Sequence, residues 1–205
     1  MQAIRQTTKK FRTYLNFVSH QQYLILCCLL VISFLFAILA ITLGSYGLSI
    51  FDFIKGSTTT IQNTVLIEIR LPRVILSAIV GASLGISGAA LQGLFRNPLA
   101  DPGLIGVSAG AALGATLIIV LGGDLFDQYS LGIYFIPIAA VAGASLVIFM
   151  LYLMTKGFGY EGVTYMLLIG IAINAIAGVG IGILTYISTD AELRSLTFWT
   201  MGSFG

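Results

Sequence analysis

The chain has 205 residues, of which 58% are hydrophobic and only 9% are charged, and its formal net charge is +2. An ordinary soluble domain carries about 25% charged residues, so this composition excludes one. The apolar residues form runs of about 20, the length of a helix that crosses a bilayer, rather than alternating strands of about ten. Because a spanning backbone must satisfy its own hydrogen bonds, the expected fold class is all-α, a polytopic helical membrane protein.

The expected elements follow the apolar runs in chain order. Residues 1–23 form a basic segment, residues 24–188 a five-helix transmembrane domain and residues 189–205 an external interfacial segment. The expected spans are 24–43, 74–94, 104–122, 133–155 and 166–187. The first run is too long for the core of a removable signal sequence, so we expect it to remain in the mature protein.

The orientation follows from the lysine and arginine residues near the span ends, because such residues are retained on the cytoplasmic side. A cytoplasmic N-terminus places six of them inside: Arg5, Lys9, Lys10, Arg12, Arg96 and Lys156. It places four outside: Lys55, Arg70, Arg73 and Arg194. We therefore expect the N-terminus in the cytoplasm and the C-terminus outside. The basic cluster before the first span is typical of a lipid-headgroup anchor rather than a nucleic-acid site.

No set of residues predicts catalysis, a metal site or a directly bound cofactor. Cys27 and Cys28 occupy consecutive positions of the first span, which point apart, and His20 is the only histidine. Lys156 is followed by Gly157 rather than Ser or Thr, so a phosphate-binding loop is not expected. An intramembrane enzyme is therefore disfavoured, and the energy for any transport has to come from a partner.

Glycine recurs at helical spacing in three spans. The sets are Gly81 and Gly85; Gly106, Gly110 and Gly114; and Gly170, Gly178 and Gly182, which share a face with Asn174. Such faces let helices pack closely in lipid, and they also suit helices that move in a gated pathway. Asn174 fits either a water-filled cavity or a structural hydrogen bond between helices.

A short polar connection, residues 95–103 with the sequence FRNPLADPG, joins the second and third spans. Asn97 and Asp101 each precede a proline, and this pattern favours turns in which the Asx side chain caps nearby backbone. The topology places this connection, called the elbow below, in the cytoplasm.

Arg70 and Arg73 flank Pro72 at the other end of the second span. Proline suits the first turn of a helix, where its missing donor costs nothing. Interfacial snorkelling accounts for one of these arginines, but a pair on the side that disfavours cations better fits a docking site for an acidic protein surface.

The last segment carries a helix start signal. Thr189 and Glu192 have the spacing of a capping box, so a helix is expected to begin near Asp190. An apolar stripe follows: Leu193, Leu196 and Trp199 or Met201. This helix either shapes an external channel mouth or anchors the chain at the interface.

Three blocks carry a family resemblance: RLPR, then SGAALQGLFRNPLADPGLIGVSAGA, then DAELRSLTFWTMGSFG. Together they resemble the permease family of bacterial ABC importers for ferric siderophores, haem and cobalamin. The resemblance implies a homodimeric or heterodimeric channel with ten helices per subunit in the cytoplasmic membrane. It also implies a cytoplasmic ATPase that uses ATP and an external substrate-binding lipoprotein or periplasmic protein.

The resemblance also implies roles for particular residues. Arg70 and Arg73 would dock the binding protein, and the fifth span would line the pathway with Gly170, Asn174 and Gly178. The cytoplasmic gate would contain Asn97 and Leu99 of the elbow, with Thr164 a weaker candidate.

The chain resembles about half of such a permease, the N-terminal half, and the resemblance implies five further spans and coupling helices in a C-terminal half. The expected function is a permease subunit for an iron complex, haem or ferric siderophore. The alternatives are a non-transporting or split fragment that needs a separate C-terminal half, and a cobalamin permease.

Overall fold

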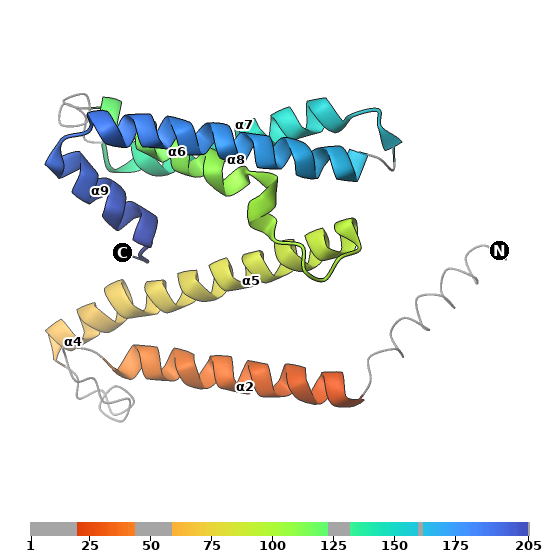
Figure 1. Cartoon of the computed structure of the whole chain (residues 1–205). Helices are drawn as coiled ribbons and strands as arrows, with labels where there is room; N and C mark the ends of the chain where they lie inside the picture. Colours follow the sequence, from red (N-terminus) through yellow and green to blue (C-terminus); the bar gives the residue numbers. More distant parts are fainter. Residues whose placement is uncertain (1–19, 44–58, 123–131, 160–161, 205) are drawn as a thin grey trace, which may run out of the picture. The chain divides into compact units, whose positions relative to one another are not determined.

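A computed structural model describes residues 20–43, 59–122, 132–159 and 162–204. The elements are labelled in Figure 1, and the chain divides into two compact units, Met1–Ile79 and Val80–Gly205. The first unit contains α2 (His20–Thr42), α4 (Thr60–Thr64), the π-helix η1 (Val65–Arg70) and the start of α5 (Leu71–Phe95). The second contains the rest of α5, the 3₁₀-helix η2 (Pro102–Ile105), α6 (Val107–Leu121), α7 (Gly132–Thr155), α8 (Gly162–Ile187) and α9 (Asp190–Met201).

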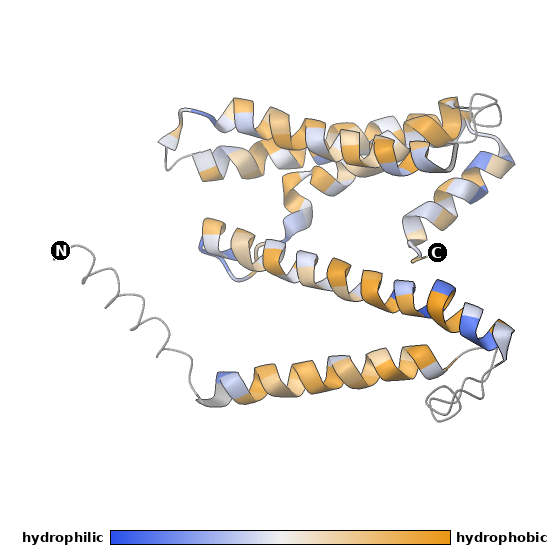
Figure 2. Cartoon of the chain, turned by 180° about the vertical axis from the view of Figure 1, so that it is seen from behind, coloured by the Kyte–Doolittle hydropathy of each residue, from blue (hydrophilic) through white to orange (hydrophobic). Residues whose placement is uncertain are grey.

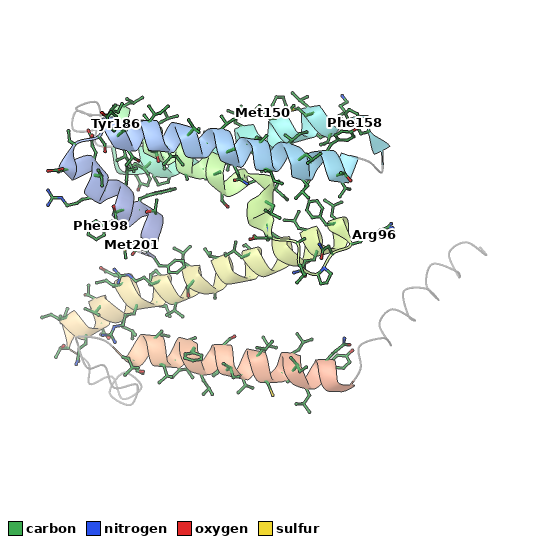
Figure 3. All side chains as sticks on the ribbon, in the orientation of Figure 1. Arg96, Met150, Phe158, Tyr186, Phe198 and Met201 are labelled. Carbon is green, nitrogen blue, oxygen red and sulfur yellow. The ribbon has the colours of Figure 1, made fainter. Side chains whose placement is uncertain are left out.

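The all-α class is confirmed for the described residues. Among the described residues, four helical stretches are long and apolar enough to cross a membrane: Gln22–Thr42, Thr60–Phe95, Tyr134–Thr155 and Gly162–Ile187. Figure 2 shows hydrophobic residues along most of the length of these helices, and Figure 3 shows side chains projecting outward along them, among them Tyr186, which is 90% exposed. A helix that is apolar all round suits a lipid environment.

The second predicted span begins earlier than expected. The expected start was residue 74, whereas helical backbone begins at Thr60 and continues to Phe95. Thr59 and Gln62 form a capping box there, with the Thr59 amide donating to the Gln62 side chain at 2.9 Å. Pro72 does lie in the first turn of α5, but α5 continues the π-helix, which widens the backbone immediately before the proline ring.

The third predicted span is shorter than expected. Instead of a helix over 104–122, η2 is followed by Gly106 in a left-handed conformation (φ 86°) and then by α6, with 15 residues. At 1.5 Å per residue α6 is about 22 Å long, below the roughly 30 Å of a bilayer core. The break at Gly106 therefore turns the first part of this apolar run into a separate short element.

The α6–α7 crossing is a contact between backbones. A Cβ built on Gly143 of α7 would collide with the carbonyl oxygen of Gly110 and lie 3.5 Å from Cα of Gly114, both on α6. The predicted close packing of Gly110 and Gly114 is thus confirmed. Gly81 and Gly85 of α5 differ, since a Cβ there would meet nothing within 4 Å in the part of the chain that the structure describes.

Candidate functional site

Arg70 is engaged within the first unit. Its Nη1 donates to the carbonyl oxygens of Ile41 at 2.7 Å and Thr42 at 3.2 Å, at the C-terminal end of α2. These carbonyls belong to the last turn of the helix, which has no intrahelical donors for them and attracts a cation. Arg70 therefore caps α2, a role that the sequence did not predict because the partners lie 28 and 29 residues away.

Arg73 lies one turn further on and is exposed, as is Glu68 of the π-helix. The two arginines thus differ in environment, since Arg70 is half-buried. The docking role that the sequence suggested for both stays a prediction, and exposure makes Arg73 the better placed of the two.

The elbow begins where α5 ends in a Schellman motif. The amide of Asn97 donates to the Gln92 oxygen at 3.1 Å, and the amide of Arg96 donates to the Gly93 oxygen at 3.3 Å. Arg96 occupies the position in this motif that usually holds glycine, with φ 50°. The left-handed conformation is costly for an arginine, by about 1 kcal/mol, while its charge near the helix C-terminus is favourable.

The predicted Asx turns are confirmed. The Asn97 side chain accepts from the Leu99 amide at 2.9 Å, and the Asp101 side chain accepts from the Gly103 amide at 2.8 Å. Between them Leu99 is 86% exposed. The elbow thus presents a large apolar side chain at the tip of a turn that local hydrogen bonds define.

The far end of the elbow is held against α8. Asn174 donates from Nδ2 to the Gly103 carbonyl oxygen at 3.0 Å. A Cβ on Gly170 would collide with the Leu104 oxygen and lie 2.8 Å from Cα of Ile105, so α8 and η2 touch through their backbones. The structural hydrogen bond considered for Asn174 is therefore present, although its acceptor belongs to η2 rather than to a spanning helix.

The other two predicted residues of α8 lie apart from this contact. Thr164 is exposed in the first turn of α8. Gly178 is also exposed, and a Cβ there would meet nothing within 4 Å among the described residues. The structure therefore brings Gly170 and Asn174 together with the elbow, while Gly178 and Thr164 face outward from the described unit.

The α9 capping box is confirmed. The Thr189 amide donates to the Glu192 carboxylate at 2.7 Å, and the Glu192 amide donates to the Thr189 hydroxyl at 3.4 Å. Of the predicted stripe, Leu196 is buried and Trp199 half-buried, whereas Leu193 and Met201 are exposed.

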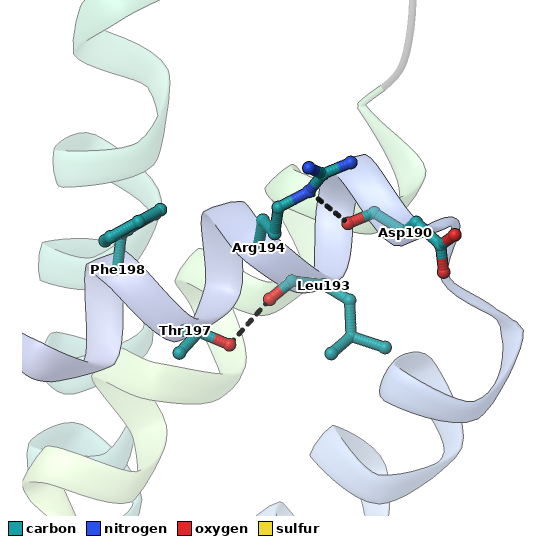
Figure 4. A pocket seen from close by; sticks show the side chains of 5 residues that line it. All are labelled: Asp190, Leu193, Arg194, Thr197 and Phe198. Atoms are coloured by element: carbon teal, nitrogen blue, oxygen red, sulfur yellow. Dashed lines mark hydrogen bonds between the residues drawn. The ribbon is translucent and has the colours of Figure 1, made fainter.

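An open hollow of about 500 Å³ lies along α9 and is lined by Asp190, Leu193, Arg194, Thr197 and Phe198. Figure 4 shows these five side chains from close by. The side chains of Arg194 and Thr197 donate hydrogen bonds to carbonyl oxygens four residues earlier in the same helix.

The described residues contain no group of three or more His, Cys, Asp and Glu side chains able to hold a metal ion. The polar features described above lie at helix ends, in one short connection and at Asn174 in the middle of α8. The fold and these features define the class of protein, a polytopic helical membrane protein with a structured elbow between two of its helices.

The particular family follows from comparison with known proteins. A family model for the FecCD transport family matches residues 29–205, and the chain belongs to that family. It is similar to the hemin transport system permease protein HmuU of Yersinia pestis, with 40% identity over 185 residues. It is also similar to the vitamin B12 import system permease proteins BtuC of Shigella boydii and Escherichia coli, with 36% identity over 180 residues for the former.

These matches cover most of this chain but only part of each relative. The alignments include 90% and 88% of the chain and 54% and 52% of HmuU and the Shigella protein. A solved ABC transporter assigned to the metal-chelate type, in an inward-facing conformation, matches with a TM-score of 0.68 and 33% identity over 88% of this chain and 53% of that one. The chain thus spans about half the length of the relatives it matches.

Proposed function

We propose that the chain forms part of a permease subunit of an ATP-binding-cassette importer, which carries an iron complex, haem or ferric siderophore, across the bacterial cytoplasmic membrane. The single observation that supports this most is the family match over residues 29–205, which includes the elbow and α9. The relatives are named as transport permeases, so the proposed role is transport rather than catalysis.

The proposal assigns a partner to each side of the membrane. The N-terminus lies in the cytoplasm, and so does the elbow, where Asn97 and Leu99 with Thr164 contribute to a gate. The exposed Arg73, together with the half-buried Arg70, docks an external substrate-binding protein. A second permease subunit completes the channel, and a separate ATPase hydrolyses ATP for it.

Helix α8 is proposed to line the pathway. Gly178 leaves its surface open, and the exposed apolar residues around it give a wall without charge. An uncharged wall suits a large chelate, because strong charge pairing would hold the cargo in place.

Haem and ferric siderophores are preferred over cobalamin as cargo, and the external binding protein offers the test. We expect the binding protein encoded beside this permease to bind haem or a ferric siderophore at submicromolar concentration, measured by quenching of its own fluorescence during titration. Cyanocobalamin serves as the comparison ligand. Binding of cyanocobalamin alone would contradict the iron-complex assignment and leave a cobalamin permease.

The second candidate is a non-transporting or split permease, in which a separate chain supplies the C-terminal half. A neighbouring reading frame that encodes the remaining spans would favour a split permease. Uptake that appears only when both chains are co-expressed would establish it.

A further inference from the structure

We infer that Asn174 is a positioning residue that latches the elbow to α8, so that the gate turn moves with α8. The latch comprises Gly170 and Asn174 of α8 and the backbone of residues 103–106. This inference rests on the proposed function only where it concerns gating. The contact itself is part of the folded chain and does not depend on transport.

A hydrogen bond joins Asn174 of α8 to η2. Asn174 Nδ2 lies 3.0 Å from the Gly103 oxygen, which also accepts from the Gly106 amide at 3.3 Å. One carbonyl therefore closes the 3₁₀ turn and receives the α8 side chain. Since an amide placed in a mostly apolar helix is costly without a partner, this bond fixes the rotation of α8 relative to η2.

The backbones of α8 and residues 103–106 fit closely against each other. One turn before Asn174, Gly170 is buried, and any Cβ there would collide with the Leu104 oxygen. Gly106 completes the fit: its φ of 86° is one that L side chains rarely adopt, and a Cβ there would lie 3.0 Å from Ile173 Cγ2. Two glycines, one on each element, thus allow the contact that the hydrogen bond then holds.

The centre of the latch is buried. Ile105 is only 5% exposed and forms a cluster with Val147 and Leu151 of α7. Partly buried residues of α5, α6 and α8 pack against this cluster: Leu91, Phe95, Val107, Met166, Ile169 and Ile173. The η2 end of the elbow is therefore anchored in apolar packing.

The tip of the elbow contrasts with this end. Asn97, Pro98 and Leu99 are exposed, and the hydrogen bonds around them are short-range, from the Leu99 and Ala100 amides to Asn97. Local hydrogen bonds order the tip, but it makes few tertiary contacts. In contrast, η2 has local hydrogen bonds and also packs against other helices. A displacement of α8 would consequently be transmitted through the latch to the tip.

Spin-label distances test the latch in the chain itself. Nitroxides at Leu99 and Tyr186, both exposed, are introduced in a Cys27→Ala, Cys28→Ala background, and the labelled chain is diluted with unlabelled chain in lipid nanodiscs. Asn174→Leu keeps the side-chain size and removes the donor. We expect the population with a displaced elbow to rise roughly fivefold, the factor that corresponds to about 1 kcal/mol, a typical net value for one hydrogen bond.

Gly170→Ala provides a second variant that leaves Asn174 in place. Its Cβ would push η2 away, so the displaced population should again rise, whereas the matched Gly182→Ala, which meets nothing within 4 Å in the described chain, should leave the distances unchanged. Unchanged distances in both Asn174→Leu and Gly170→Ala would overturn the latch.

A transport measurement separates the latch from the proposed function. In the assembled importer, Asn174→Leu should lower the amount of cargo moved per ATP hydrolysed, whereas Gly88→Ala on α5, where a Cβ meets nothing within 4 Å among the described residues, should not. If the unmodified importer moves no cargo, the proposed function fails, and the distance measurement still decides the latch. If cargo per ATP stays at the unmodified value although the elbow is displaced, the latch does not couple to the gate.

Discussion

Gly143→Val is expected to destabilise the second unit by about 3 kcal/mol, at the upper end of the usual cost of overpacking. A Cβ at this position would collide with the Gly110 carbonyl oxygen, and Gly114 Cα lies close behind. Both neighbours are backbone atoms, so no side chain can turn aside. Helices α6 and α7 would have to separate, and the dispersion contacts of the crossing would be lost.

The fluorescence of Trp199, the only tryptophan of the chain, reports this change during denaturation in mixed detergent micelles. The matched control is Gly182→Val on α8, because a Cβ there meets nothing within 4 Å among the described residues. The control carries the same Gly-to-Val change in intrinsic helix propensity, which favours valine slightly, so any difference between the two variants reports the contact. If Gly143→Val and Gly182→Val shift the midpoint equally, the α6–α7 crossing is not held by backbone contact.

Arg73→Glu is expected to weaken binding of the external protein by at least about tenfold, or 1.4 kcal/mol, without affecting the fold. The reason is that Arg73 is exposed, so its reversal changes the surface that a partner meets. Affinity is measured with the assembled importer in nanodiscs at two salt concentrations. An electrostatic contact also predicts that the variant has the weaker salt dependence.

Arg70→Ala is the comparison variant, because it removes one positive charge from the neighbouring turn, whereas Arg73→Glu replaces a positive charge with a negative one. Its main expected effect is on folding, since the carbonyl oxygens of Ile41 and Thr42 lose their donor. A hydrogen bond from a charged group contributes about 1.5–3 kcal/mol when buried, so about 1 kcal/mol is expected for this half-buried residue. Equal binding by the Arg73→Glu and unmodified importers would remove the docking assignment.

Hydropathy and local turn chemistry were sufficient to predict the class and much of the local structure. The apolar runs predicted the order of the spans, and the Thr189–Glu192 spacing predicted the start of α9. The Asx turns at Asn97 and Asp101 followed from pre-proline chemistry. All of these depend on residues within a few positions of one another.

The differences arise where backbone conformation or distant residues decide. The polar residues of α4 were expected to belong to a connection rather than to a helix. The helical start there depends on a capping box and a π-helix, neither of which produces an apolar periodicity in the sequence. Gly106 lies inside an apolar run, and hydropathy does not register its left-handed conformation. Gly143, the partner of Gly110 and Gly114, was missed, although Ala139, Gly143 and Val147 recur every four residues.

The site was predictable as a set of residues but not as an arrangement. Asn174 was recognised as unusual among apolar neighbours, yet its acceptor is 71 residues away in the chain. Arg70 and Arg73 looked equivalent from their spacing, and only the end of α2 distinguishes them. In each case the missing information was the identity of the tertiary neighbour.

Uptake by proteoliposomes tests the central claim most directly. The importer containing this chain is reconstituted with ATP inside, and the loaded binding protein is added outside with haem or a ferric siderophore. The account predicts that the iron complex accumulates inside only when ATP and the binding protein are both present. Accumulation of equal extent without ATP, or none with both present, would contradict it.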